Sequence, residues 1–348
     1  MLRDSSTSLG MTVAGSVLAI CSLTLAMALA AREPTMKAVV IHEYGGPEVL
    51  KYEDIPRPEP KDDQLLIRVI AAGVNPVDGM IRSGMFAKEG NRAFPIILGG
   101  DVAGVVEKVG SKITKFKAGD PVFAYVSLDY SGGYAQYTLV TEREAAPKPK
   151  SLTYVEAAAV PVVAMTAWQA LVDTAKLSAG QTVLIHGGSG GVGSFAIQIA
   201  KARGEKVIAT ASTANQDFLK QLGADVAIDY TKQKFEDVAK DVDVVLDSIG
   251  RDTLARSYAV VKKGGIIVSL VARPKESELE KHGIRGTALN AEPNSGELAE
   301  IGRLIDDKKI KVIVSQTFPL SEAMKAQEQV ATGHTRGKIV LKVADEPK

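Results

Sequence analysis

Hydrophobic and polar positions follow two different patterns along this chain of 348 residues, and the pattern changes near Ser151. From Met36 to that point, short apolar or alternating runs lie between Gly- and Pro-rich turns, which is typical of β-strands. We expect strands at 37–42, 64–72, 102–109, 122–126 and 134–140. The first pattern therefore predicts an irregular β-barrel.

The second pattern begins near Leu152 and alternates strands with helices. Its expected strands are 182–185, 206–210, 226–229, 242–247, 265–270 and 285–290. Its expected helices are 194–203, 215–222 and 252–261, with another near 296–307. Such alternation predicts a parallel sheet that has helices on both faces and binds its ligand at the carboxyl ends of the strands.

The end of the chain returns to the first pattern. Residues 310–343 carry short strand patterns and one helical pattern at 321–331. We expect this segment to fold back onto the β-barrel. The predicted parts are a leader at 1–35, a barrel domain at 36–157 completed by 312–348, and a parallel-sheet domain at 158–311.

A glycine-rich turn lies between the strand at 182–185 and the helix at 194–203. In it, Gly188, Gly190 and Gly193 have the G-x-G-x-x-G spacing. Glycine permits the tight turn and a close approach of backbone to a diphosphate, and the helix N-terminus attracts phosphate. The flanking periodicity favours this reading over a plain glycine loop. We predict a doubly wound Rossmann sheet with a diphosphate site made of Gly188, Ser189, Gly190, Gly191, Val192 and Gly193.

The end of the next strand indicates which dinucleotide binds. An NAD site usually carries Asp or Glu there, which accepts from the ribose 2′-hydroxyl. Here residues 210–216 contain no acid before Asp217, and Ser212 and Thr213 can donate to a 2′-phosphate. We predict NADP(H), although this turn holds no Arg or Lys and Ser212 could be an ordinary turn residue.

Charge and cysteine content exclude several other classes. The net charge of +1 gives no reason to expect nucleic acid or an anionic membrane surface as a partner. Cys21 is the only cysteine, and the four histidines have no zinc-ligand spacing, so we predict no metal site. Ser189 lies in a glycine pattern that favours phosphate contact over nucleophilic catalysis.

The N-terminal segment leaves the location of the protein open. Residues 11–30 are apolar and almost uncharged, and Ala28-Leu-Ala30 resembles a signal-peptidase site. The segment could be a signal peptide or an anchor that associates with a membrane. It could also be a false start, because Met36 begins a natural first strand, and the protein would then be cytoplasmic.

Several motifs resemble the medium-chain dehydrogenase/reductase superfamily. They are Val74-Asn-Pro-Val-Asp78, Leu98-Gly-Gly-Asp101, Gly132-Gly-Tyr-Ala-Gln-Tyr137, Ala164-Met-Thr-Ala-Trp168 and Arg336-Gly-Lys-Ile-Val-Leu341. The chain is most similar to the zinc-free branch of quinone oxidoreductases and enoyl or enone reductases. The resemblance runs from about Met36 to Val343 and implies that the barrel domain is a GroES-like catalytic domain.

The resemblance also implies the chemistry and its residues. Zinc-binding members carry a cysteine where Asn75-Pro76 stands and Gly-His-Glu where Gly99-Gly-Asp101 stands, so both ligand positions are vacant. NADPH would then reduce a small quinone or the C=C bond of an α,β-unsaturated carbonyl compound. The implied residues are Asn75 for catalysis, Phe86 and Tyr130 in the substrate pocket, Thr166, Ser269, Leu270 and Val271 near the nicotinamide, Ser212 and Tyr230 at the adenosine, and Lys338 at a phosphate. Relatives suggest a homodimer.

Two departures from the family pattern keep alternatives open. Phe86 stands where enoyl thioester reductases have a catalytic tyrosine, and Gln216 stands where many quinone oxidoreductases have a lysine. The first departure leaves the proton donor unidentified and the second weakens the case for NADP(H). The alternatives are a non-catalytic NADP-binding protein of the same fold and, further off, an alcohol dehydrogenase.

Overall fold

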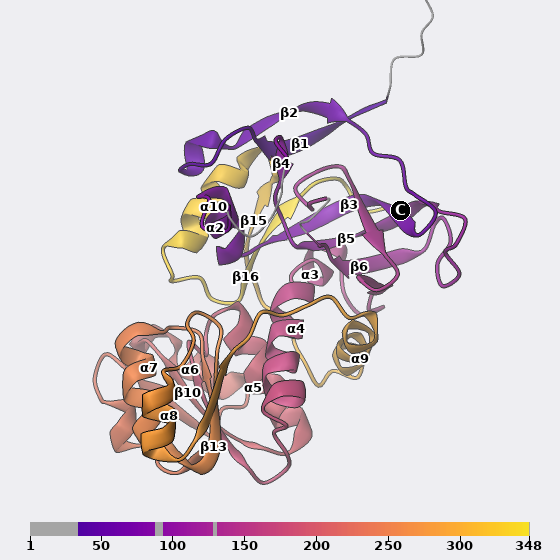
Figure 1. Ribbon diagram of the computed structural model, residues 1–348. Helices are drawn as coiled ribbons and strands as arrows, with labels where there is room; N and C mark the ends of the chain where they lie inside the picture. The colour runs from indigo at the N-terminus through magenta and orange to yellow at the C-terminus, as the bar shows by residue number, and fades with distance from the viewer. Residues whose placement is uncertain (1–33, 88–92, 128–130, 348) are drawn as a thin grey trace, which may run out of the picture. The chain divides into compact units, whose positions relative to one another are not determined.

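The computed structural model describes residues 34–87, 93–127 and 131–347 (Figure 1). The apolar segment at 11–30 and the predicted pocket residue Tyr130 lie outside these ranges. Met36–Lys348 forms one compact unit. Among the described residues, no helix has the length and apolar character that crossing a membrane requires.

The second half of the chain forms a parallel sheet whose strand order is β11-β10-β9-β12-β13-β14. This order reverses direction between β9 and β12, the position at which doubly wound sheets bind ligands. The strands are β9 (Thr182–His186), β10 (Lys206–Ala211), β11 (Val226–Asp229), β12 (Val242–Asp247), β13 (Val261–Ser269) and β14 (Arg285–Ala288).

Both faces of this sheet are buried, because successive side chains of each strand point to opposite faces. In β9, Val183 and Ile185 join the core beneath α4, α5, α6 and α9, whereas Leu184 joins the core beneath α7 and α8. The helices are α4 (Pro161–Trp168), α5 (Gly191–Arg203), α6 (Gln216–Gln221), α7 (Arg251–Ser257), α8 (Glu276–His282) and α9 (Ser295–Asp306).

The first half and the end of the chain together form two mostly antiparallel sheets, ordered β2-β1-β4 and β15-β16-β3-β5-β6-β8, with β7 also paired to β3. The strands are β1 (Thr35–Ile41), β2 (Lys51–Pro56), β3 (Gln64–Val74), β4 (Ile96–Ile97), β5 (Asp101–Val109), β6 (Pro121–Tyr125), β7 (Tyr137–Thr141), β8 (Ala145–Pro147), β15 (Val314–Pro319) and β16 (Lys338–Lys342). Three helices accompany them, namely α2 (Pro76–Arg82), α3 (Tyr154–Ala157) and α10 (Ala323–Ala331).

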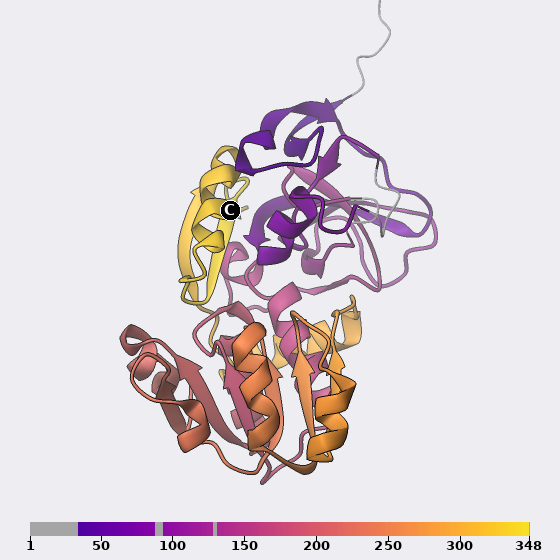
Figure 2. The ribbon, with the colours of Figure 1, turned by 60° about the vertical axis from the view of Figure 1, so that its left-hand side comes forward.

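The end of the chain returns to the first half, as Figure 2 shows for the segment drawn in yellow. Residues Ile339 to Lys342 of β16 pair antiparallel with Val74 to Ala71 of β3. This pairing places the loop before β16 beside the residues that follow β3. The predicted α/β fold, a doubly wound parallel sheet joined to a barrel-type domain, is confirmed.

Four of the described helices, α2, α3, α4 and α8, have no counterpart among the sequence-based expectations, and α4 is the longest of them. Helix α4 continues into a π-helical turn at Gln169–Thr174 and lies against α5 and α9. Val163, Ala164, Met165 and Ala167 are all buried, so the helix lacks a solvent-exposed polar face. The 3.6-residue alternation that reveals a surface helix is therefore missing from its sequence.

Candidate dinucleotide cleft

The glycine turn has the geometry that its spacing predicts. It joins β9 to α5, whose N-cap is Gly190 in an extended conformation. A Cβ on Gly193 would lie 2.3 Å from the carbonyl oxygen of Gly187, and a Cβ on Gly188 would lie 2.8 Å from Leu219. Side chains are therefore excluded where the helix meets the strand. The first N–H groups of α5 have no partners within the helix and can bind an anion at this end.

A cleft of ≈ 680 Å³ opens above this turn. Its walls come from the carboxyl ends of β9, β10, β11 and β12, from the residues after β3, and from the segment 333–338 before β16. The predicted site residues that line it are Asn75, Ser189, Gly190, Gly191, Val192, Gly193, Ser212, Tyr230 and Lys338. The structure thus brings residues separated by more than half of the chain into one cleft.

The segment before β16 is attached to the glycine turn. The Gly337 N–H donates to the Ser189 carbonyl at 2.9 Å, and Gly190 and Gly337 form a parallel bridge. Gly337 has a φ of +67°, and a Cβ there would lie 2.4 Å from the Ile313 carbonyl oxygen. Glycine at this position therefore allows the segment to form one wall of the cleft.

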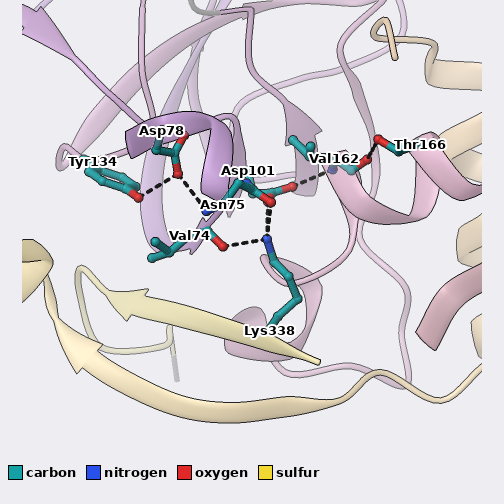
Figure 3. Close-up of polar contacts among 8 residues, drawn as sticks. All are labelled: Val74, Asn75, Asp78, Asp101, Tyr134, Val162, Thr166 and Lys338. Atoms are coloured by element: carbon teal, nitrogen blue, oxygen red, sulfur yellow. Dashed lines mark hydrogen bonds and ion pairs between the residues drawn. The ribbon is translucent and has the colours of Figure 1, made fainter. Parts of the chain in front are cut away.

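Asn75 is held by a buried polar network (Figure 3). Its Nδ2 donates to Asp101 Oδ2 at 2.7 Å, and its Oδ1 accepts from the Lys338 ammonium at 2.5 Å. Asp101 Oδ1 in turn accepts from the Val162 N–H at 2.6 Å. A carboxylate accepts only and an ammonium donates only, so these partners fix which end of the Asn75 amide faces each of them.

A second carboxylate, that of Asp78, holds the backbone of Asn75. Asp78 Oδ2 accepts from the Asn75 N–H at 2.8 Å and from the Tyr134 hydroxyl at 2.8 Å. Burial raises the pKa of Asp78 to about 6, against the lowering effect of these donors and of Lys338. Burial and the neighbouring Asp78 charge also raise the pKa of Tyr134 well above its usual value. The network therefore contains a carboxylate that titrates close to neutrality.

The ammonium of Lys338, which the resemblance assigns to a phosphate, is surrounded by oxygen atoms of the chain itself. It donates to the Val74 carbonyl at 2.9 Å as well as to Asn75, and it lies 3.0 Å from Asp101 Oδ2. These three oxygens match its three N–H donors, so it is not directed at a phosphate. Its stem passes Gly191, where a Cβ would lie 3.1 Å from Lys338 Cδ. Lys338 is better described as a residue that positions Asn75.

Several other predicted site residues do not line the cleft. The Thr166 hydroxyl donates to the Val162 carbonyl at 2.6 Å, and the Ser269 hydroxyl is buried against Asp247 Oδ2 at 2.8 Å. Phe86 packs beside the core of the antiparallel sheets. Leu270 and Val271 follow β13, and Gly188 lies behind the turn against Leu219. No wall of the cleft includes these six residues.

Arg336 is a cleft residue that the sequence-based reasoning missed. It lines the cleft beside Ser212 and Asn215, although 121 residues separate it from Asn215 in the chain. Its Nε donates to Asn215 Oδ1 at 2.9 Å. The turn after β10 carries no cation of its own, and only the pairing of β16 with β3 brings one to it.

The histidine that begins the glycine turn is a core residue. His186 shares hydrogen bonds with the hydroxyls of Thr210 and Ser257, at 3.2 and 3.1 Å, and packs edge-on against Phe235. Burial lowers its pKa to about 4, so its ring is neutral near pH 7. Over the ranges that the structure describes, no three His, Cys, Asp or Glu side chains are grouped so that they could hold a metal.

Together, the doubly wound sheet, the glycine cradle and the cleft at the strand ends define a dinucleotide-binding protein of the α/β class. Models of two protein families match the chain: "Alcohol dehydrogenase GroES-like domain" over residues 61–150 and "Zinc-binding dehydrogenase" over residues 222–341. The chain belongs to the medium-chain dehydrogenase/reductase superfamily, and it is an oxidoreductase of that superfamily.

Curated relatives and solved structures place it among reductases. An NADPH-dependent alkenal/one oxidoreductase of Arabidopsis thaliana is 41% identical over 88% of this chain and 79% of its own. A quinone oxidoreductase of Mus musculus is 35% identical over 90% of this chain and 99% of its own. The quinone oxidoreductase of Escherichia coli, solved with NADPH, is 31% identical, covers 88% of this chain and all of its own, and has a TM-score of 0.81.

Proposed function

We propose that this protein is a zinc-independent, NADPH-dependent oxidoreductase that reduces quinones or the C=C bond of α,β-unsaturated carbonyl compounds. The observation that carries the proposal is the position of Asn75. It lines the cleft that the glycine turn opens and is held by Lys338 and Asp101 in a single orientation.

The cleft fits a dinucleotide. Gly193 and Gly188 lie where a side chain would collide with the Gly187 carbonyl or with Leu219, so α5 can begin close against β9 and direct its first N–H groups at a diphosphate. Ser212 and Tyr230 lie at the far end, where the adenosine would bind, with no acid in the turn at 210–216. Such a cleft does not repel a 2′-phosphate, which favours NADP(H) over NAD(H).

Asn75 is placed to polarise a substrate carbonyl. One N–H of its amide donates to Asp101, and the second remains for a substrate oxygen that gains negative charge as the C=C bond is reduced. Lys338 holds the amide oxygen, so the donor cannot flip away. NADPH supplies the hydride when bound. The chain's own residues supply orientation and a hydrogen bond at the carbonyl.

The same network supports the proposed independence from zinc. Where zinc-binding relatives place metal ligands, the chain has Asn75 and Asp101, and the Lys338 ammonium lies between their oxygens. The Lys338 ammonium already compensates the Asp101 charge, and the side chains of Lys338 and Asp101 are only 4% and 0% exposed. A divalent cation at this position would have to displace a buried lysine.

The substrate is a small quinone or enone, as the names of the relatives suggest. Reduction at C=C separates this proposal from alcohol dehydrogenase chemistry, which acts at C–O. A homodimer and an association of residues 11–30 with membranes remain predictions of the same reading.

A deuterium experiment tests the proposal. The protein is incubated with NADPH deuterated at nicotinamide C4 and a 2-alkenal, and the product is analysed by mass spectrometry and NMR. We expect a saturated aldehyde with one deuterium on the β-carbon. Asn75→Ala should turn over on the order of 100-fold more slowly. An allylic alcohol with deuterium on the former carbonyl carbon would contradict C=C reduction.

A further inference from the structure

Arg336 is fixed against the turn that follows β10. Its Nε donates to Asn215 Oδ1 at 2.9 Å and its Nη2 donates to the Ala214 carbonyl at 3.0 Å. Its guanidinium carbon lies 5.0 Å from the centre of the Phe218 ring. Two hydrogen bonds and a cation–π contact therefore hold an exposed arginine in one place. Such a fixed cation loses little side-chain entropy when it binds an anion.

The acids near this turn are already compensated. Asp229 accepts from the hydroxyls of Thr213 and Thr231, at 2.6 and 2.7 Å, and these bonds lower its pKa to about 2. Lys232 lies 3.6 Å from the same carboxylate. Asp217 points into solvent with a side chain that is 92% exposed. These acids therefore have partners other than Arg336, and the guanidinium can pair with an anionic ligand in the cleft.

Two hydroxyl donors line the cleft together with the Arg336 guanidinium. Ser212 and Tyr230 line the cleft together with Arg336, and Tyr230 is exposed at the end of β11. The two bonds to Asn215 and Ala214 use two of the five N–H groups of the guanidinium. The others can donate in parallel to a phosphate, which is the geometry that arginine provides and lysine does not.

We propose that Arg336 is the residue that makes this cleft select NADP(H) over NAD(H), by binding the adenosine 2′-phosphate from the C-terminal segment. The inference rests on the proposed function, because it needs the dinucleotide in this cleft. The turn at 210–216 has no cation of its own, and Arg336, 121 residues beyond Asn215, supplies one. Lys338, two residues later, belongs to Asn75 instead.

Calorimetric titration of the full chain with NADPH, NADH, 2′,5′-ADP and 5′-ADP tests the assignment. For Arg336→Gln we expect the Kd for NADPH and for 2′,5′-ADP to rise on the order of 10- to 100-fold. The Kd for NADH and for 5′-ADP should stay within about threefold, since these ligands lack the contacted group. Added salt should weaken NADPH binding less in the variant than in the wild type.

Arg256→Gln is the matched control. Arg256 also lies over a phenylalanine ring, at 4.7 Å from the centre of Phe235, and is bonded to Glu236, but it does not line the cleft. We expect this variant to keep both affinities. Thermal unfolding of each variant separates loss of the fold from loss of the contact.

Each result bears on a different claim. An equal loss of NADPH and NADH affinity in a folded Arg336→Gln variant would mean that Arg336 shapes the cleft and does not bind the 2′-phosphate. An unchanged preference for NADPH would also overturn the inference while leaving the proposed function intact. A wild-type protein that binds neither dinucleotide would overturn the proposed function itself.

Discussion

At the scale of single residues, the most consequential contact is the buried pair of Lys338 and Asp101. A charge that is removed from water is costly unless a partner compensates it. Here each charge has the other, and Asn75 and the Val74 carbonyl complete the set. The pair therefore links the stability of the cleft to the orientation of its candidate catalytic amide.

Removing one partner of this pair should destabilise the protein more than removing both charges. We expect Lys338→Met to lower the free energy of unfolding by roughly 3–5 kcal/mol, because it leaves the buried Asp101 charge without a counter-charge. The double variant Lys338→Met/Asp101→Asn should recover part of that loss. Urea unfolding of the single and double variants measures the coupling. Strictly additive losses would show that the two charges do not compensate each other.

The unusual titration of Asp78 predicts a pH dependence of stability. Its pKa is raised from 3.8 to about 6 in the folded state, so the folded protein favours the protonated form. The resulting stabilisation is fully present below pH 3.8 and is lost as the pH rises through 6. Between these limits the wild type should lose roughly 3 kcal/mol relative to Asp78→Asn.

Chemical unfolding of wild type and Asp78→Asn from pH 4 to pH 7 checks this sign. Asn keeps an oxygen that can accept from the Asn75 N–H and the Tyr134 hydroxyl, so the variant is a near-isosteric match. A stability difference that does not change with pH would contradict the raised pKa.

At the scale of elements, the turn from β9 to α5 depends on two glycines for different reasons. A Cβ on Gly193 would lie 2.3 Å from the Gly187 carbonyl oxygen, which no rotamer change can relieve. A Cβ on Gly190 would meet that same oxygen at 3.4 Å, an ordinary contact, and the φ of Gly190 is −77°. The two positions therefore differ in what they demand of the backbone.

Substitution at these two glycines should have unequal effects. We expect Gly193→Ala to lower thermal stability clearly and to abolish NADPH binding, because α5 must move away from β9. Gly190→Ala should fold with a melting temperature close to that of the wild type. Thermal unfolding and fluorescence titration of NADPH distinguish the two. A stable Gly193→Ala variant that binds NADPH normally would refute the packing argument.

The sequence predicts elements well where a strand is buried on both faces. Strand β12, all of whose residues are buried, has the expected bounds, since a mostly apolar run between turn residues marks it. Helix α4 leaves no periodic signal because it is buried on most sides. Of the residues that line the cleft, those of the glycine turn and Asn75 could be predicted from sequence motifs. Arg336 and the partners of Lys338 were not, because their neighbours are set by strand pairing far away in the chain.

At the scale of the whole molecule, the described core and cleft lie within Met36–Lys348. Cleft residues come from the parallel sheet and from the sheet that contains β3 and β16. Cofactor binding should therefore join the two halves of this unit.

We expect a variant that begins at Met36, the first residue of this compact unit, to fold and to bind NADPH. We expect its melting temperature and its Kd for NADPH to match those of the full chain within experimental error. Differential scanning calorimetry and fluorescence titration of the two proteins make the comparison. A truncated protein that unfolds or loses its affinity for NADPH would show that residues 1–35 contribute to the fold.

The most direct test of the account is steady-state consumption of NADPH by the full chain after exhaustive treatment with a metal chelator. A 1,4-quinone and a 2-alkenal serve as acceptors, and NADH is compared with NADPH. The account predicts turnover with at least one acceptor, a preference for NADPH and no loss of rate after chelation. Tight binding of NADPH without consumption by either acceptor, or activity that returns only when zinc is restored, would contradict it.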